Sequence, residues 1–251
     1  MVGSSIMKKE SKGKLQGCSK TKKSRSRDKN HKVPNILALP NELVTEILAL
    51  VASSSSIDLF SAKLSCKDIF QATEDKYIYR QVSLERFPPV PWFISKQASS
   101  FLDRCKENGN PEALFRQGVV ECFSQIKLES GLRCLKRAAS SGHHRASYIL
   151  GVILLCSENK YEQEGMKLID DVKRNKKIGE CRQKLKDIIW NIWLKNKFIL
   201  EAKPNGCPLS HLHRKREGWP SFNVDDDDDI SCRECSCHRE VIFVCNLLKG
   251  A

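Results

Sequence analysis

The segment from Leu39 to Arg80 has more apolar residues than three short helices can bury among themselves. Two apolar stripes recur at helical spacing in its first helix. They are Leu43, Ile47 and Leu50 on one face and Val44, Leu48 and Val51 on the adjacent face. A surface helix normally has one such stripe, so two stripes predict contacts on two sides. The segment therefore packs on the rest of the chain or binds a partner, and the pattern alone leaves both alternatives open.

Local signals predict where these helices begin and end. Pro40 favours a helix start, because a proline lacks the N–H that would be unbonded there. Four serines after the first helix predict its end, and Asp58 and Asp75 are candidate caps for a second and a third helix. The second helix is expected to carry Leu59, Leu64, Ile69 and Phe70.

These residues resemble an F-box. The pattern is Leu39-Pro40-x-Glu42-Leu43-x-x-x-Ile47-Leu48, a later Leu, a Cys-Lys pair and an aromatic-rich third helix, with Ser65 and Ile69 as departures from the common residues. The resemblance implies binding to the Skp adaptor of cullin–RING ubiquitin ligases. It assigns the contact positions to Leu39, Pro40, Leu43, Ile47, Leu48, Leu59, Leu64, Cys66 and Lys67.

Changes in composition divide the chain into five segments. They are a basic tail at 1–34, the F-box at 35–86, a Pro-rich linker at 87–94, a helical repeat at 95–200 and a Cys/His-rich segment at 201–251. The tail contains most of the net charge of +13 and few large apolar residues, so it is expected to be disordered. It is either a nuclear localisation segment or a solubilising tail. It has no aromatic residue to stack on bases, which disfavours specific nucleic-acid binding.

An internal repeat lies in the helical region after the Pro-rich linker. Ala113 pairs with Ala146, and Gly118 with Gly151, both at an offset of 33 residues. In the following helices, Gly131 pairs with Gly165 at an offset of 34 residues. These offsets fit paired-helix units and resemble tetratricopeptide and Sel-like repeats.

An array of only two such units needs further helices that cover the apolar surface at its two ends. The sequence predicts one capping helix around Phe101, Leu102 and Cys105, and another from Leu185 to Trp193. Trp190, Trp193 and Phe198 fit either a ligand-binding stripe or the core, and helical spacing favours the core.

The last segment carries a candidate structural zinc site. Cys232 and Cys235 have the spacing that directs two thiolates at one ion. Cys207 with His211 or His213 is the best second pair, although Cys237, His238 and Cys245 make the ligand choice ambiguous. An unmetallated Cys-rich tail is the alternative.

No motif predicts catalysis or membrane insertion. The chain lacks a Gly-rich phosphate loop, a nucleophile elbow and a His-Glu-x-x-His sequence. It also lacks a run of about 18 apolar residues. We expect a mainly α, non-catalytic protein of the nucleus and/or cytoplasm. The combination of an N-terminal F-box, a Sel-like helical repeat and a Cys/His-rich tail resembles a plant F-box family. The resemblance implies a substrate-recognition subunit of an SCF-type ubiquitin ligase, which links the Skp adaptor, and through it the cullin, to an unidentified target. The alternatives are a helical-repeat scaffold without a ligase role and a zinc-dependent nucleic-acid-binding protein.

Overall fold

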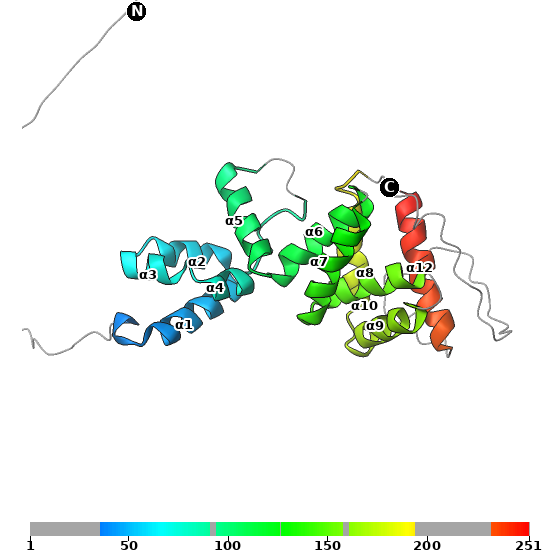
Figure 1. Ribbon diagram of the computed structural model, residues 1–251, viewed down its shortest axis with the longest axis horizontal. Coiled ribbons are helices and arrows are strands. Elements are labelled where there is room, and N and C mark those ends of the chain that lie inside the picture. Colours follow the sequence, from blue (N-terminus) through cyan, green and yellow to red (C-terminus); the bar gives the residue numbers. More distant parts are fainter. Residues whose placement is uncertain (1–35, 91–93, 126, 158–160, 194–231, 251) are drawn as a thin grey trace, which may run out of the picture.

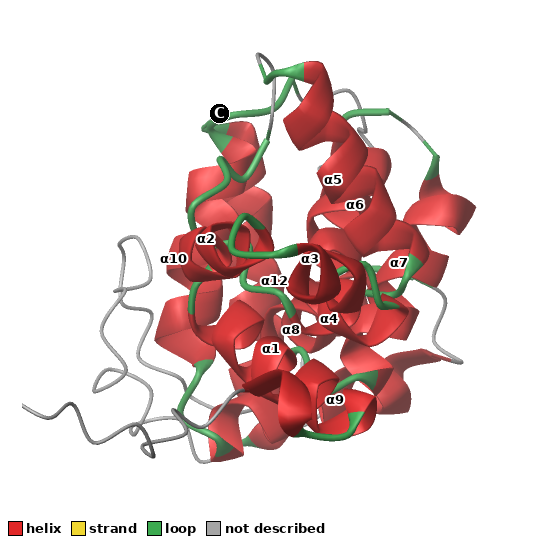
Figure 2. Cartoon of the chain, turned by 90° about the vertical axis from the view of Figure 1, so that its left-hand side faces the viewer, coloured by secondary structure: helices red, strands yellow, loops and turns green. Residues whose placement is uncertain are grey.

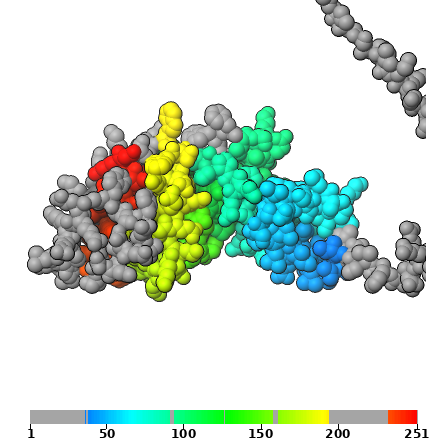
Figure 3. Space-filling view, turned by 180° about the vertical axis from the view of Figure 1, so that it is seen from behind, coloured from blue at the N-terminus to red at the C-terminus, as the bar shows by residue number. Residues whose placement is uncertain are grey.

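The computed structural model describes residues 36–90, 94–125, 127–157, 161–193 and 232–250. Every regular element in these residues is a helix, as Figure 2 shows. The helices form an N-terminal unit at one end and a larger body of paired helices (Figure 1). Seen from behind, the N-terminal unit projects from one end of this body (Figure 3). The expected mainly α fold, with a small helical unit followed by a helical repeat, is confirmed.

The N-terminal unit consists of one 3₁₀ turn and four α-helices. They are η1 (Ile36–Ala38), α1 (Asn41–Ser54), α2 (Ser56–Lys63), α3 (Lys67–Ala72) and α4 (Lys76–Gln81). One apolar stripe of α1 lies in the core of this unit, where Val44 is 4% exposed and Leu48 is 3% exposed. Ile78 and Tyr79 of α4 pack into the same core. The expected use of one stripe of α1 within the chain is confirmed.

The segment that was expected to form one second helix forms two helices, α2 and α3. Its cap is Ser55, whose hydroxyl accepts the N–H of Asp58, so Asp58 lies in the first turn and is not the cap. The helix ends at Lys63, and the extended backbone of Cys66 precedes α3. This break places Leu64 outside either helix and leaves it 87% exposed. The predicted cap of the third helix is confirmed, because the Asp75 carboxylate accepts the N–H of Tyr77.

Helix α5 (Lys96–Glu107) contacts α6 (Pro111–Phe123), the first repeat helix, and so covers the start of the repeat as predicted, but it also belongs to the core of the N-terminal unit. Its Phe101 ring lies 5.5 Å from the ring of Phe87 and 5.8 Å from that of Tyr79. Cys105 is completely buried in the same cluster. The sequence pattern showed an apolar face on this helix but could not show which neighbour the face covers.

Polar side chains of the first repeat helix fix the N-terminal unit to the body. The Asn110 amide donates to the carbonyl oxygens of Tyr79, Arg80 and Val82. The Arg116 guanidinium donates to the carbonyl oxygens of Leu84, Phe87 and Pro88. The beginning of the expected linker is therefore bonded to the repeat, and the boundary between the two parts is a packed junction.

The repeat consists of two close helix pairs. The first is α6 (Pro111–Phe123) with α7 (Leu128–Ser140), and the second is α8 (His144–Leu155) with α9 (Glu162–Arg174). A Cβ atom added at Gly131 would lie 2.9 Å from the carbonyl oxygen of Gly118. A Cβ added at Gly165 would lie 2.9 Å from that of Gly151. These distances are too short for a side chain, so the repeated glycines allow the helix backbones to approach, as the sequence predicted.

Two further helices cover the end of the repeat. They are α10 (Ile178–Ile189) and α12 (Arg233–Lys249), and α12 contacts α8, α9 and α10 (Figure 1). The apolar side chains of α10 are buried, so its predicted capping role is confirmed. Trp190 and Trp193 are 62% and 76% exposed, which contradicts their expected core position. Phe198 lies outside the described residues.

The description of 201–251 as a Cys/His-rich segment missed α12. Its buried face includes Cys237, Val241, Val244 and Leu248, which recur at helical spacing. A completely buried ion pair fastens the same face, because the Arg182 guanidinium donates to both carboxylate oxygens of Glu240, at 3.0 and 2.5 Å. The Tyr148 hydroxyl donates to the same carboxylate at 3.0 Å. The C-terminal helix is therefore part of the repeat core.

A second charged cluster joins successive repeat units. Glu112 of α6 accepts from Arg116 at 2.7 Å and from Arg145 of α8 at 2.9 Å. His143 Nδ1 accepts the N–H of Ala146, so its Nε2 carries the proton that it donates to Glu112 at 3.0 Å. Burial alone would raise the pKa of Glu112, but these donors and charges lower it to about 2.

This cluster predicts a loss of stability in acid. A pKa of about 2 in the folded chain, against an ordinary value of 4.5, means that the unfolded chain takes up the proton first as the pH falls. The contribution of Glu112 is complete above pH 4.5 and disappears toward pH 2, and its size is about 3 kcal/mol. Urea unfolding of the wild type and of Glu112→Gln, from pH 6 to pH 3, measures this. The variant should be less stable at pH 6 and should have a flatter pH profile, and parallel profiles would contradict the assignment.

Candidate functional site

The second apolar stripe of α1 is exposed. Here the α1 stripe means Leu39, Leu43, Ile47 and Leu50, of which Leu39 lies before the helix, next to its N-cap residue Pro40. Leu43 is 46% exposed, Ile47 is 37% exposed and Leu50 is 67% exposed. No described part of the chain covers these side chains. Contiguous exposed apolar residues of this kind mark interaction surfaces.

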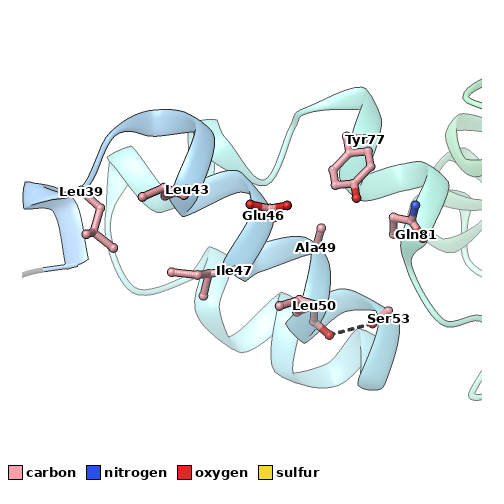
Figure 4. Close-up of a pocket in the computed structure, with 9 residues that line it drawn as sticks. All are labelled: Leu39, Leu43, Glu46, Ile47, Ala49, Leu50, Ser53, Tyr77 and Gln81. Atoms are coloured by element: carbon pink, nitrogen blue, oxygen red, sulfur yellow. Dashed lines mark hydrogen bonds between the residues drawn. The ribbon is translucent and has the colours of Figure 1, made fainter.

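The α1 stripe lines one side of a shallow groove of about 300 Å³. Tyr77 and Gln81 of α4 lie on the other side, and Glu46 and Ser53 add polar groups (Figure 4). In the close-up, Leu39, Leu43, Ile47 and Leu50 follow one another along α1 (Figure 4). An apolar floor with a few polar groups at its edge fits a protein interface better than a catalytic centre.

An ion-pair cluster holds the helices behind the groove together. Glu74, which lies between α3 and α4, pairs with Lys63 of α2 and with Arg104 of α5. Burial raises the pKa of Glu74, but hydrogen bonds from these two side chains and from Tyr79 bring it below its ordinary value. Burial and the Glu74 charge raise the pKa of Tyr79 to about 12, so its hydroxyl remains a donor. These contacts join α2, α4 and α5 through Glu74.

The structure separates the predicted contact residues into two groups. Those exposed are Leu39, Pro40, Leu43, Ile47, Leu64, Cys66 and Lys67. Leu48 and Leu59 are each 3% exposed and lie in the core of the N-terminal unit, so they support this unit from inside, and their contact with the adaptor stays a prediction. The family pattern contains both core and surface positions, and the pattern alone did not distinguish them.

Sequence reasoning missed two parts of this groove. Leu50 belongs to the apolar stripe and is 67% exposed, but it is not among the adaptor-contact positions that the F-box resemblance assigns. Tyr77 is 45% exposed and comes from a helix separate in sequence, so only the fold places it opposite α1. The helical spacing of Leu43, Ile47 and Leu50 is the sequence signal that could have identified Leu50 as a contact residue.

The buried and the exposed contact residues differ in their expected effect on stability when they are replaced. Leu59→Ala should lower the free energy of unfolding by about 2–4 kcal/mol, because it leaves a cavity in a close-packed core. Leu64→Ala should change it by less than about 0.5 kcal/mol, because the side chain is already in water. Urea denaturation followed by circular dichroism measures both variants. Similar losses for the two would show that Leu64 is packed in solution.

The structure describes two of the four candidate zinc ligands. Cys232 caps α12 and Cys235 lies in its first turn, whereas Cys207 and His211 lie outside the described residues. Within the described ranges, no group of three or more His, Cys, Asp or Glu residues is arranged to hold a metal ion. The zinc site stays a prediction. None of the described helices is long and apolar enough to cross a membrane.

Comparison with known proteins agrees with this architecture. A family model described as plant tetratricopeptide repeats matches residues 85–190. A putative F-box protein of Arabidopsis thaliana is 30% identical over 210 residues, which cover 77% of this chain and 70% of the relative. Two further Arabidopsis F-box proteins are 27% and 23% identical, covering 49% and 74% of this chain and 76% and 53% of their own lengths. No solved structure matches the chain. The extent of the match to the first relative, together with the residues of the N-terminal unit, shows that the chain belongs to the plant F-box protein family.

Proposed function

We propose that this chain is the substrate-recruiting subunit of an SCF-type ubiquitin ligase and that the α1 stripe binds the Skp adaptor. One observation carries the proposal: α1 buries one of its apolar stripes and exposes the other. Val44 and Leu48 are buried in the core, whereas Leu43 and Ile47 on the adjacent face remain accessible. A helix that has two apolar faces and buries only one of them within the chain can bind a partner with the other.

The junction with the repeat leaves the α1 stripe free. Asn110 and Arg116 bind backbone carbonyls between Tyr79 and Pro88, and α5 contributes Phe101 and Cys105 to the core. Neither set includes a residue of the α1 stripe. The alternative in which the second apolar face packs within the chain is therefore not supported by the described residues.

In this proposal the remainder of the chain holds the target. The repeat and α12 pack together and are hydrogen-bonded to the N-terminal unit through Asn110 and Arg116, so a bound target would be held in the same assembly as the adaptor and cullin. Catalysis then comes from proximity, because a tethered target raises the effective concentration of its acceptor lysine near the ubiquitin-charged enzyme. The chain itself acts as a non-catalytic adaptor in the nucleus and/or cytoplasm.

Reconstitution distinguishes this role from that of a scaffold. The purified chain, a plant Skp adaptor and a cullin are mixed and separated by gel filtration, with and without the adaptor. The proposal predicts that the chain elutes with the cullin only when the adaptor is present. A chain that elutes alone in both mixtures would support the scaffold alternative.

A further inference from the structure

Three cations gather on the exposed side of α7, and together they form the α7 face. Arg133 precedes Lys136 and Arg137 by three and four residues, so all three lie on one side of the helix. The Arg137 guanidinium reaches the turn between α5 and α6, where a Cβ added at Gly109 would lie 3.5 Å from its Nη2 atom. The three side chains are exposed, and none forms an ion pair with any residue in the described part of the chain.

The acidic side chains of the neighbouring helices do not neutralise the α7 face. Asp103 of α5 pairs with Lys106 at 3.0 Å, and Glu112 of α6 belongs to the charged cluster between the repeat units. Glu121 of α6 is only 8% exposed and lies beneath the surface. Glu129 is exposed one turn before Arg133, but the structure shows no ion pair between the two.

The corresponding helix of the second pair has its charges compensated within the chain. The repeat offset of 34 residues places Asp170 and Asp171 of α9 at the positions of Lys136 and Arg137. Asp170 pairs with Arg233 of α12, and Asp171 pairs with a basic residue of α9 itself. The charges at these positions therefore stabilise the fold on α9 but remain available on α7. A surface with uncompensated charge of one sign attracts a partner of the opposite sign.

We propose that the α7 face binds an acidic segment of the target protein, an inference that rests on the proposed function for the identity of this partner. Each guanidinium can bind a carboxylate through two parallel N–H bonds, and Lys136 adds a further charge. A protein partner fits this face better than a nucleic acid, because α7 has no aromatic residue to stack on bases. The α7 face lies in the repeat and the α1 stripe in the N-terminal unit (Figure 1), so target and adaptor would occupy separate surfaces.

Cross-linking with a carbodiimide, which joins a carboxylate to a nearby lysine, tests the proposal on the full chain. The probe is a peptide of alternating aspartate and glycine, used below saturation, and mass spectrometry measures the cross-link at Lys136. The lysines of residues 1–34 are an internal reference for non-specific binding to the basic tail. Arg133→Glu with Arg137→Glu should lower the yield at Lys136 at least about tenfold, because two attractive charges become repulsive.

A matched control has the same change in net charge. Arg80 and Lys167 are also exposed and form no ion pair in the described chain, and Lys167 occupies the position of Arg133 in the second helix pair. Arg80→Glu with Lys167→Glu should leave the yield at Lys136 within about twofold of the wild type at about 0.1 M salt, where distant charges are screened.

Adaptor binding separates this inference from the proposed function. The variant with both α7 arginines replaced should bind the Skp adaptor as the wild type does, and a loss would overturn the separation of the two surfaces. A wild type that captures the peptide at Lys136 but does not bind the adaptor would refute the ligase role and support an acidic partner for the α7 face.

Three results with the wild type would overturn the proposal. The first is cross-linking confined to the lysines of residues 1–34. The second is a cross-link from Lys136 to the chain's own Asp225–Asp229 run in the absence of peptide, which would assign the α7 face to this chain. The third is displacement of the peptide from Lys136 by a single-stranded oligonucleotide at a lower concentration than by free peptide, which would assign the face to nucleic acid.

Discussion

Replacing Leu43 and Ile47 with aspartate is expected to weaken binding to the Skp adaptor by at least about 100-fold, or about 2.7 kcal/mol. Both side chains belong to the α1 stripe and are partly exposed, so an adaptor that covers them would remove the remaining apolar surface from water. Each aspartate would instead place an unpaired charge in the interface, which costs several kcal/mol. Titration calorimetry with a purified adaptor measures the affinity of each variant.

A matched control separates this effect from a general effect of added charge. Ile242 of α12 is 45% exposed, close to the 46% of Leu43, and it lies on the distant end of the body. Ile242→Asp should leave adaptor binding within about twofold of the wild type. The double variant should keep its helical circular dichroism, because the two side chains face away from the core. An unchanged affinity of the double variant would show that the adaptor binds elsewhere.

Glu240→Ala is expected to destabilise the repeat body by about 3–5 kcal/mol, because it removes a carboxylate that pairs with the buried Arg182 guanidinium at 2.5 Å. Arg182 and Glu240 are both completely buried, so water cannot replace the lost contacts. The change also removes the acceptor of the Tyr148 hydroxyl. Burial and the Glu240 charge raise the pKa of Tyr148 well above its ordinary value, so this hydroxyl keeps its proton. Thermal unfolding should show a fall of roughly 10 °C in the midpoint.

Two controls test the cause of this loss. Replacing both partners, as Arg182→Met with Glu240→Leu, should recover much of the stability, because both buried charges of the pair are then removed together. Glu180→Ala removes a carboxylate that is about half exposed and should cost less than about 1 kcal/mol. A loss for Glu240→Ala no larger than that for Glu180→Ala would mean that α12 is not held by this pair in solution.

The spacing of residues along the sequence predicted those features of the fold that depend on a single helix or on a neighbouring helix pair. The spacing of Leu43, Ile47 and Leu50 indicated a second apolar face on the first helix, and that face is exposed. The recurrence of glycine at 118 and 151 indicated close helix pairs, and added side chains would clash there. Both signals depend only on the helical repeat of about 3.6 residues and on side-chain size.

The features that the sequence did not show are contacts between distant segments. Leu48 and Leu59 match the family pattern, but only the packed unit shows that they are buried. The apolar face of α5 could have covered either neighbour, and Phe101 packs on the N-terminal unit. The period of Val241 and Val244 was present in the C-terminal segment, yet its cysteines drew attention to metal binding. The Arg182–Glu240 pair joins two helices that no local pattern connects.

Hydrogen–deuterium exchange of the purified chain, with and without a saturating Skp adaptor, tests the central claim most directly. The adaptor should slow exchange in peptides covering residues 39–53, which include the α1 stripe, and should leave α12 unchanged. Unaltered exchange in residues 39–53, or protection confined to the repeat, would contradict the assignment of this surface to the adaptor.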